Sequence, residues 1–432
     1  MIYLLIIWFL VFTKLFVFWL WLWQLKEYHW KRLKAHFETQ ALKKLFFSLH
    51  GIRYPKLTIK IALIIASGLI LEAVFLALKP SLLWLIITII IAPLFASLLV
   101  LLFQIPTSIV IKRTLNKAKE KRAQFKDLIV IGISGSYGKT AVKEFLYEIL
   151  SEKFKTLKTK KNNNAEIGIA KTILQELDSQ EILVVEIGAY ERGKIKQVCD
   201  IIKPKIGILT GINEQHLSTF GSLENIKKAK QEIIDCSSEG ITKPEVEATD
   251  IIVDKEYLSF KIDGVAFRVN LLGRHNIDNV LFAVSCAKKL GMSLEEISKG
   301  CLKIRPEQGS MKIVNRNPLV LDASYSANSN GVLADLDYLN TYEGKKIIVM
   351  PCLIELGSQG KEVHRRIGEK IDQVCDLAII TTKDYYNEIK SEKTIFLSDY
   401  EEILNELKKY PDSTILLEGR VPQGIKKALN LP

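Results

Sequence analysis

The chain has few cysteines and no CxxC spacing among them, so its thiols point to no metal site. It also has no internal repeat at a fixed period and no low-complexity tract, which leaves a repeat architecture unsupported. The 6 cysteines all lie between Cys199 and Cys375, in the part of the chain expected to face the cytoplasm, and reduced core thiols are expected there. At 432 residues, the chain is long enough for two or three domains.

Negative charge is scarce in the first part of the chain. Residues 1–127 carry 18 lysines and arginines against 5 acidic residues, whereas residues 128–432 carry 42 against 43. The formal net charge of +12 therefore belongs to residues 1–127 alone.

Three apolar runs in this basic part contain almost no charge: residues 2–23, 61–78 and 81–105. Each is long enough to cross a bilayer as a helix. The first run has no basic region before its apolar core and no small-residue cleavage site, which favours an anchor over a signal peptide. The pair Lys79-Pro80 leaves almost no loop between the second and third runs, which predicts a helical hairpin with both ends on one side.

Lysine and arginine flank these runs. Residues 24–60 hold 9 of them against 2 acids and residues 106–127 hold 7 against 2, so the positive-inside rule places both segments in the cytoplasm. We expect a multi-pass protein of the inner (cytoplasmic) membrane with the rest of the chain, residues 128–432, in the cytoplasm. Residues 28–50 predict a basic amphipathic helix on an anionic membrane, so membrane lipids are expected partners and nucleic acid is not. Lys14 and Glu72 could pair or mark a lipid-headgroup site.

From Leu128 onward, short apolar runs alternate with helical patterns, which predicts an α/β fold. Runs such as residues 182–185 are apolar on both faces, which favours a parallel sheet covered by helices. The segment 237–250 is poorly patterned and is expected to be a loop. The predicted strands are residues 128–133, 182–187, 206–210, 319–322, 346–350, 377–381 and 414–417.

The stretch Gly132-Ile-Ser-Gly-Ser-Tyr-Gly-Lys-Thr140 stands between a predicted strand and a predicted helix, as a phosphate-binding loop requires. Ile133 occupies the place of the first glycine of the general P-loop pattern. Lys139 would reach the outer phosphates and the Thr140 hydroxyl could bind Mg²⁺. The alternative is an ordinary glycine-rich turn. The loop residues expected to surround ATP phosphates are Gly135, Ser136 and Gly138.

Two further side chains follow predicted strands. Glu186 ends an apolar strand, where a carboxylate can hold the Mg²⁺ that accompanies a triphosphate. His216 follows the next strand and could be a second metal ligand. The alternative for Glu186 and for His216 is a purely structural role. A helical pattern follows at residues 222–233, and its lysines would ordinarily face solvent.

Together, these features resemble one family, the Mur ligases, and most nearly the branch that adds D-alanyl-D-alanine to a UDP-N-acetylmuramoyl-tripeptide. The resemblance covers about residues 128–425. It implies a P-loop central domain and a Rossmann-like C-terminal domain that closes over the nucleotide. The motifs that carry it are residues 132–140, 185–189, 211–217, 220–222, 229–233, 272–279, 321–328 and 354–357, with His364.

The resemblance also implies the site. Lys139 and Thr140 would bind ATP and Mg²⁺, Glu186 and His216 would complete the metal sites, and Lys230 matches the lysine that some members carbamylate to give a metal-binding carboxylate. The expected reaction is ATP-dependent amide formation through an acyl phosphate, and Lys139, Lys230 and His216 are the expected catalytic residues. The residues implied to contact the nucleotide from other motifs are Asn276, Asn279, Asp322 and Tyr325.

The sequence also departs from the family pattern, at Ala165, Ser310, Ala323 and Ser329. The UDP-sugar-binding domain of the family is replaced by the apolar helices. We therefore expect a membrane anchor at 1–127, a central ATP-binding domain at 128–303 and a C-terminal domain at 304–432. The expected partners are an amino-acid or dipeptide amine and a muramoyl-peptide carboxylate. A lipid-linked or non-peptidoglycan carboxylate, or a degenerate ATP-binding membrane scaffold, is the alternative.

Overall fold

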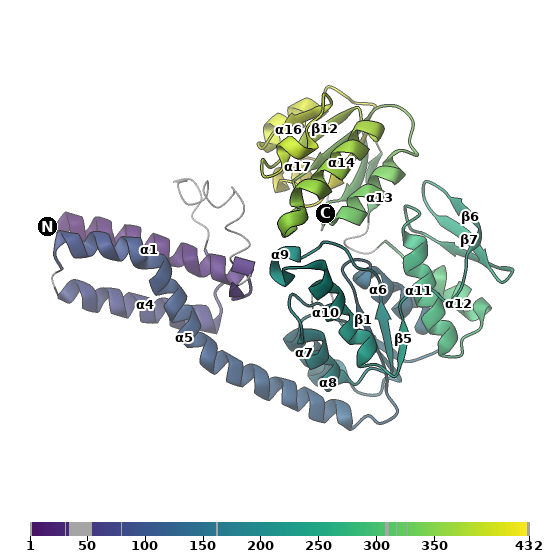
Figure 1. Cartoon of the computed structure of the whole chain (residues 1–432), viewed down its shortest axis with the longest axis horizontal. Coiled ribbons are helices and arrows are strands. Elements are labelled where there is room, and N and C mark those ends of the chain that lie inside the picture. The colour runs from purple at the N-terminus through teal and green to yellow at the C-terminus, as the bar shows by residue number, and fades with distance from the viewer. Residues whose placement is uncertain are drawn as a thin grey trace. The chain divides into compact units, whose positions relative to one another are not determined.

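The computed structural model describes residues 2–30, 32–33, 54–78, 80–160, 163–306, 311–316, 318–325 and 327–429. It divides into two compact units, residues 1–113 and 114–432, which are described separately below (Figure 1). Most of the basic segment predicted at 28–50 lies outside the described residues, as does Ser310.

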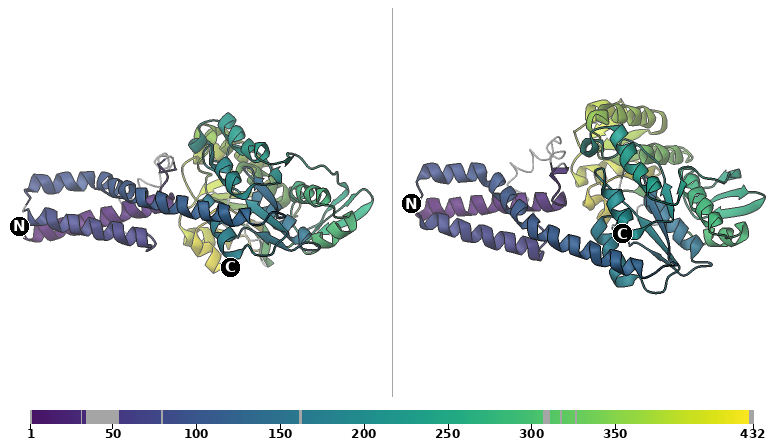
Figure 2. Two further views of the ribbon diagram at one scale, coloured as in Figure 1. Left: turned by 90° about the horizontal axis from the view of Figure 1, so that it is seen from below. Right: turned by 60° about the horizontal axis from the view of Figure 1, so that its bottom comes forward.

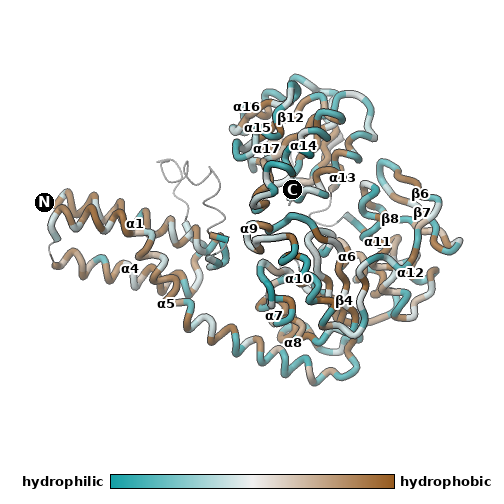
Figure 3. Tube along the Cα trace, in the orientation of Figure 1, coloured by the Kyte–Doolittle hydropathy of each residue, from teal (hydrophilic) through white to brown (hydrophobic). Residues whose placement is uncertain are grey.

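The first unit is a bundle of helices that lie side by side in Figures 1 and 2: α1 (Ile2–Leu25), α4 (Ile59–Ala77) and the first part of α5 (Leu82–Ala123). All three are long and apolar enough to cross a membrane, and Figure 3 shows their apolar character. Gly68 lets α4 approach α1, because a Cβ there would lie 2.5 Å from the Phe16 ring. Glu72 accepts a hydrogen bond from Thr13 at 3.0 Å, rather than an ion pair from Lys14.

Helix α5 continues without a break into the second unit, through Pro93 and Pro106. Leu115 and Ala118, near its end, are buried. Lys121 donates to the carbonyl of Leu174 at 3.1 Å. These residues belong to the second unit, so the end of the helix packs and hydrogen-bonds within that unit.

The central domain contains a parallel five-stranded sheet in the order β2-β3-β1-β4-β5. Every residue of β3 is buried, as the apolar pattern predicted. The expected loop at 237–250 is wrong in part, because three of its residues form β5 and the last two belong to the next sheet. The strands are β1 (Ile129–Ser134), β2 (Thr156–Lys158), β3 (Ile182–Glu186), β4 (Ile206–Leu209) and β5 (Glu239–Ile241).

Helices cover both faces of this sheet, and α6 packs closely against α11. A small antiparallel sheet, β6 (Thr249–Val253), β7 (Leu258–Ile262) and β8 (Val265–Val269), joins the same core through stacked Phe260 and Phe267. The helices of the central domain are α6 (Lys139–Leu150), α7 (Glu166–Glu176), α8 (Lys194–Ile202), α9 (Leu217–Phe220), α10 (Leu223–Asp235), α11 (Asn276–Lys289) and α12 (Leu294–Cys301).

The C-terminal domain has a six-stranded sheet in the order β13-β12-β11-β14-β10-β9, with β9 alone antiparallel to its neighbour. Alternate residues of β11 face opposite helical layers: Ile347 belongs to one apolar core and Ile348 to the other. Its strands are β9 (Lys312–Arg316), β10 (Leu319–Ala323), β11 (Lys346–Met350), β12 (Leu377–Ile380), β13 (Thr394–Phe396) and β14 (Thr414–Glu418). Its helices are α13 (Ser329–Leu339), η1 (Gly357–Gln359), α14 (Gly360–Val374), α15 (Tyr386–Ile389), α16 (Tyr400–Leu407) and α17 (Gln423–Ala428).

The expectation of reduced thiols is wrong for one pair of cysteines. Cys199 in α8 and Cys236 after α10 form a disulfide. The other four cysteines are free and buried, as expected of core residues.

Candidate active site

The loop between β1 and α6 is shaped by two glycines. Gly135 and Gly138 have φ values of 153° and 75°, which favour glycine. A Cβ on Gly135 would lie 2.2 Å from Thr210 Oγ1, and one on Gly138 would lie 2.5 Å from Asn279 Oδ1. The loop therefore needs both the conformation and the small size of glycine. It lies at the carboxyl end of β1, where parallel α/β sheets bind ligands.

Glu186 lies at the centre of the polar side chains beside this loop. Its Oε2 accepts a hydrogen bond from Thr140 Oγ1 at 3.0 Å, and its Oε1 accepts one from Asn164 Nδ2 at 3.1 Å. Lys139 donates to the carbonyl of Ser136 at 3.1 Å. Two sequence-predicted metal ligands, Thr140 and Glu186, are thus brought into direct contact.

A buried lysine that sequence reasoning missed also contacts Glu186. Lys143, on α6, is fully buried, and its Nζ lies 3.4 Å from Glu186 Oε2 and 3.0 Å from Glu144 Oε1. Glu144 also pairs with Lys158 of β2. The local sequence gives no signal for this burial, because Lys143 has the spacing of an ordinary polar position near a helix start.

His216 lies in the loop after β4, in a left-handed conformation with φ 65°. Its Nδ1 is 2.7 Å from Glu355 Oε2, and its ring meets Tyr190 edge-on at 4.7 Å between centroids. Burial is the main cause that lowers the pKa of His216. The Glu355 carboxylate opposes this effect, whereas Lys230 and Lys139 add to it.

Lys230, on α10, is buried, and its Nζ donates to the carbonyl of Ala189 at 3.2 Å. Burial first, and then repulsion from Lys139, lowers the pKa of Lys230 to about 7. Burial also lowers the pKa of Lys139, while Glu186 opposes that shift. These electrostatic effects link Lys139, Glu186, His216 and Lys230 as one cluster.

The asparagines of the 272–279 motif begin α11. Asn276 is buried and donates to the carbonyl of Leu272 at 2.8 Å, which fixes the entry to the helix. Asn279 borders the phosphate loop at Gly138. Asp322 is the next-to-last residue of β10 and its Oδ1 accepts a hydrogen bond from Ser324 N at 3.0 Å. Tyr325, beyond the strand, is 41% exposed. The roles of these four residues toward a nucleotide stay predictions.

The arrangement fits a nucleotide phosphate group with a magnesium ion. Repulsion from Lys139 contributes to the lowered pKa of the buried Lys230, so a phosphate anion near both amines would be stabilised. The buried Ser136 Oγ also has no hydrogen-bond partner among the described residues. Within that described part, no group of three or more His, Cys, Asp or Glu side chains could hold a metal by itself. Mg²⁺ would therefore need phosphate oxygens as further ligands beside Thr140 and Glu186, as is usual for this ion.

Comparison with known proteins identifies relatives of this chain. Residues 133–242 match the Mur ligase middle domain. The UDP-N-acetylmuramoyl-tripeptide--D-alanyl-D-alanine ligase of Borreliella burgdorferi is 29% identical over 70% of this chain and 74% of its own length. The Escherichia coli enzyme of the same name is 28% identical over 67% of this chain and 74% of its own. The chain therefore contains a Mur ligase middle domain and is a homologue of these D-alanyl-D-alanine ligases.

Solved structures agree with this assignment. MurF from Acinetobacter baumannii superposes with a TM-score of 0.69 at 25% identity, covering 74% of this chain and 79% of that one. MurF from Thermotoga maritima in complex with ADP gives a TM-score of 0.65 at 25% identity, covering 74% and 84%. The predicted α/β Mur ligase fold is confirmed, and so is the predicted class of ATP-dependent ligase.

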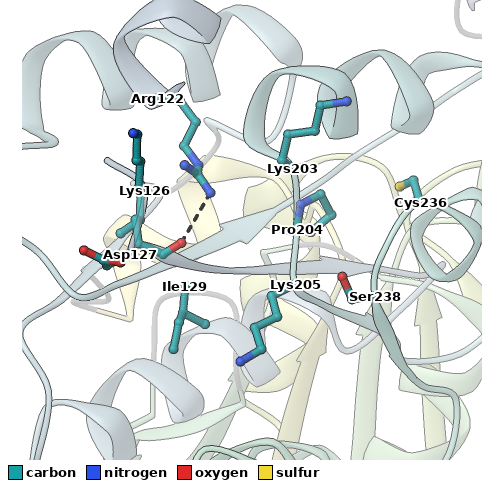
Figure 4. A pocket seen from close by; sticks show the side chains of 10 residues that line it. Arg122, Lys126, Asp127, Ile129, Lys203, Pro204, Lys205, Cys236 and Ser238 are labelled. Atoms are coloured by element: carbon teal, nitrogen blue, oxygen red, sulfur yellow. Dashed lines mark hydrogen bonds between the residues drawn. The ribbon is translucent and has the colours of Figure 1, made fainter. Parts of the chain in front are cut away.

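A hollow lies at the opposite, amino-terminal edge of the central sheet (Figure 4). It has a volume of about 440 Å³, and its lining includes the basic Arg122, Lys126, Lys203 and Lys205 beside the acidic Asp127. The guanidinium of Arg122 donates hydrogen bonds to the carbonyls of Ile202, Phe125 and Leu128. The amines of Lys126, Lys203 and Lys205 point in different directions in Figure 4. Arg122 thus ties the end of α5 to the end of α8 and to the residue that precedes β1.

Proposed function

We propose that this protein is a membrane-anchored, ATP-dependent Mur-type ligase that joins an amine to a carboxylate in cell-wall or cell-surface polymer synthesis. The observation that carries the proposal is the contact between Thr140 and Glu186 beside a loop shaped by Gly135 and Gly138, into which Lys139 folds back. His216 and Lys230 interact electrostatically with Lys139 at the same site. That cluster lies in a chain whose first unit has three helices able to cross a membrane.

In the proposed reaction, the loop amides and Lys139 hold the ATP phosphates at the positive end of α6. A carboxylate oxygen of the acceptor attacks the γ-phosphorus, ADP leaves, and an acyl phosphate forms. The nitrogen of the neutral amine then attacks the acyl carbon, phosphate leaves, and the new amide loses one proton. Thr140, Glu186 and His216 would hold Mg²⁺, which supplies charge neutralisation when bound.

The substrates follow from the relatives and from the first unit. The relatives are named as ligases of D-alanyl-D-alanine and a UDP-N-acetylmuramoyl-tripeptide. We propose the same kinds of amine and carboxylate here, a dipeptide or amino acid and a muramoyl peptide. Helices stand where the family has its UDP-sugar-binding domain, which supports a lipid-linked acceptor at the inner leaflet, with the catalytic domains in the cytoplasm.

The catalytic part of the proposal is tested by phosphate release from ATP in detergent-solubilised protein. Wild type and Lys139→Ala are compared with a panel of amines and muramoyl-peptide carboxylates, and products are identified by mass spectrometry. We expect release only when wild type has both substrates. Equal background release by both proteins with every pair would mean that the protein is a scaffold.

The acceptor is tested by competition between a soluble UDP-muramoyl-tripeptide and the corresponding lipid-linked tripeptide. We expect the lipid-linked acceptor to be used preferentially by protein in liposomes. Activity that is equally strong on the soluble acceptor would remove the lipid-linked part of the proposal. Recovery of the protein in the soluble fraction after cell lysis would refute the anchor.

A further inference from the structure

The loop that carries His216 contacts the C-terminal domain at several points. Asn213 Nδ2 donates to Asn330 Oδ1 at 2.9 Å, and Glu214 pairs with Arg366 at 2.9 Å. Farther along the loop, Ser218 N donates to the carbonyl of Glu355 at 3.2 Å. Contacts from three segments of the C-terminal domain thus fix the residues on both sides of His216.

Glu355 itself reaches the imidazole. Its Oε2 lies 2.7 Å from His216 Nδ1, and both side chains are mostly buried, with 11% and 22% exposed. Since a carboxylate can only accept, Nδ1 carries the proton and Nε2 keeps its lone pair. Nε2 is therefore the nitrogen of His216 that can bind a cation.

The two partners also share an unusual backbone. Glu355 and His216 have φ values of 66° and 65°, which cost free energy in residues other than glycine. The Glu355 loop is held from behind, because Leu353 N donates to His364 Nε2 at 2.9 Å. Two strained residues from different domains are thus held face to face.

We infer that Glu355 is a positioning residue that makes the metal site depend on docking of the C-terminal domain. The inference rests on the proposed function, in which His216 binds Mg²⁺. When the domain docks, Glu355 fixes the tautomer and orientation of His216. By linkage, a bound cation favours the docked domain to the same extent that docking favours the cation.

The test measures Mn²⁺ binding by electron paramagnetic resonance in the full-length protein with a non-hydrolysable ATP analogue. The part of the Mn²⁺ binding that disappears in Glu186→Gln is assigned to this site. We expect Glu355→Ala to weaken it about 10- to 100-fold and Glu355→Gln less, because the amide oxygen can still accept from Nδ1. Arg366→Ala, the matched control, removes an interdomain contact that does not touch His216 and is expected to change Mn²⁺ affinity less than about fivefold.

The second readout is the distance between fluorophores on the central and C-terminal domains. We expect Mn²⁺ with the nucleotide to shorten it in wild type and not in Glu355→Ala. Wild-type Mn²⁺ affinity and wild-type closure in both Glu355 variants would overturn the inference while leaving the proposed function standing. A wild-type protein that binds neither nucleotide nor Mn²⁺ would instead overturn the proposed function.

Discussion

Lys230 is expected to be about half neutral at pH 7, which makes it chemically different from a lysine of ordinary pKa. A pKa of about 7 leaves about half of the side chain neutral at pH 7, against roughly 1 in 3,000 for a lysine at the ordinary 10.5. Carbon dioxide reacts only with the neutral amine, and one proton is released as the carbamate forms. At pH 7, the fraction of Lys230 present as the reactive neutral amine is therefore about a thousandfold larger than for an ordinary lysine, which favours carbamylation.

The sign of the pH dependence follows from the same shift. Burial lowers the pKa of Lys230, so the amine is protonated below about pH 7 and becomes neutral as the pH rises through that value. We expect a carbamate signal in ¹³C NMR of protein equilibrated with labelled bicarbonate, growing between about pH 6 and pH 8.

Two variants make this measurement decisive. Lys230→Arg should abolish the signal, since a guanidinium does not form a carbamate. Lys139→Ala should move its onset to higher pH, because it removes a positive charge that lowers the pKa of Lys230. A signal that survives in Lys230→Arg, or wild-type protein with no signal up to pH 9 (about two units above the expected pKa), would refute the reasoning.

Three further predictions concern single side chains. Lys143→Met should destabilise the protein by about 3–5 kcal/mol in unfolding measurements, because it leaves the buried Glu186 without its cation and Glu144 with Lys158 alone. Lys153→Met, which breaks an exposed pair, should cost less than about 1 kcal/mol. Gly138→Ala should weaken ADP binding more than about tenfold in calorimetry, whereas Gly193→Ala, with a similar φ and nothing within 4 Å, should leave it unchanged. Thr13→Val should destabilise the first unit by about 0.5–2 kcal/mol in detergent, because it removes the hydrogen bond to Glu72 on another helix. Thr107→Val is the control, since the Thr107 hydroxyl bonds only to its own helix. Equal effects of the two substitutions would count against a role for the Glu72 contact.

The sequence predicts the buried strands well and the marginal strands poorly. All seven predicted strands are present within a residue or two, because their runs are apolar on both faces and only a covered parallel sheet satisfies such a run. The missed strands β2, β5 and β13 have three residues each and take their stability from a neighbour in the sheet. The small sheet β6-β7-β8 was missed although β7 alternates between buried and partly exposed residues.

For the site, linear motifs identify the residues that stand near strand ends, such as Lys139 and Glu186. They give no role to Lys143 or Glu355. Lys143 is distinguished only by its burial under the central sheet, and Glu355 meets a histidine 139 positions away in the chain. Both partnerships are made by tertiary packing, which one sequence does not encode in any local spacing.

The position of Lys143 affects how the divalent metal ion binds and is released. Because this ammonium is sealed inside the protein beside Glu186, the carboxylate already has a counter-charge when no nucleotide is present. A divalent cation alone therefore binds weakly beside Glu186, and it binds tightly only when phosphate oxygens are also ligands. The metal should enter with each triphosphate and depart with each diphosphate, so that purified, nucleotide-free protein carries none.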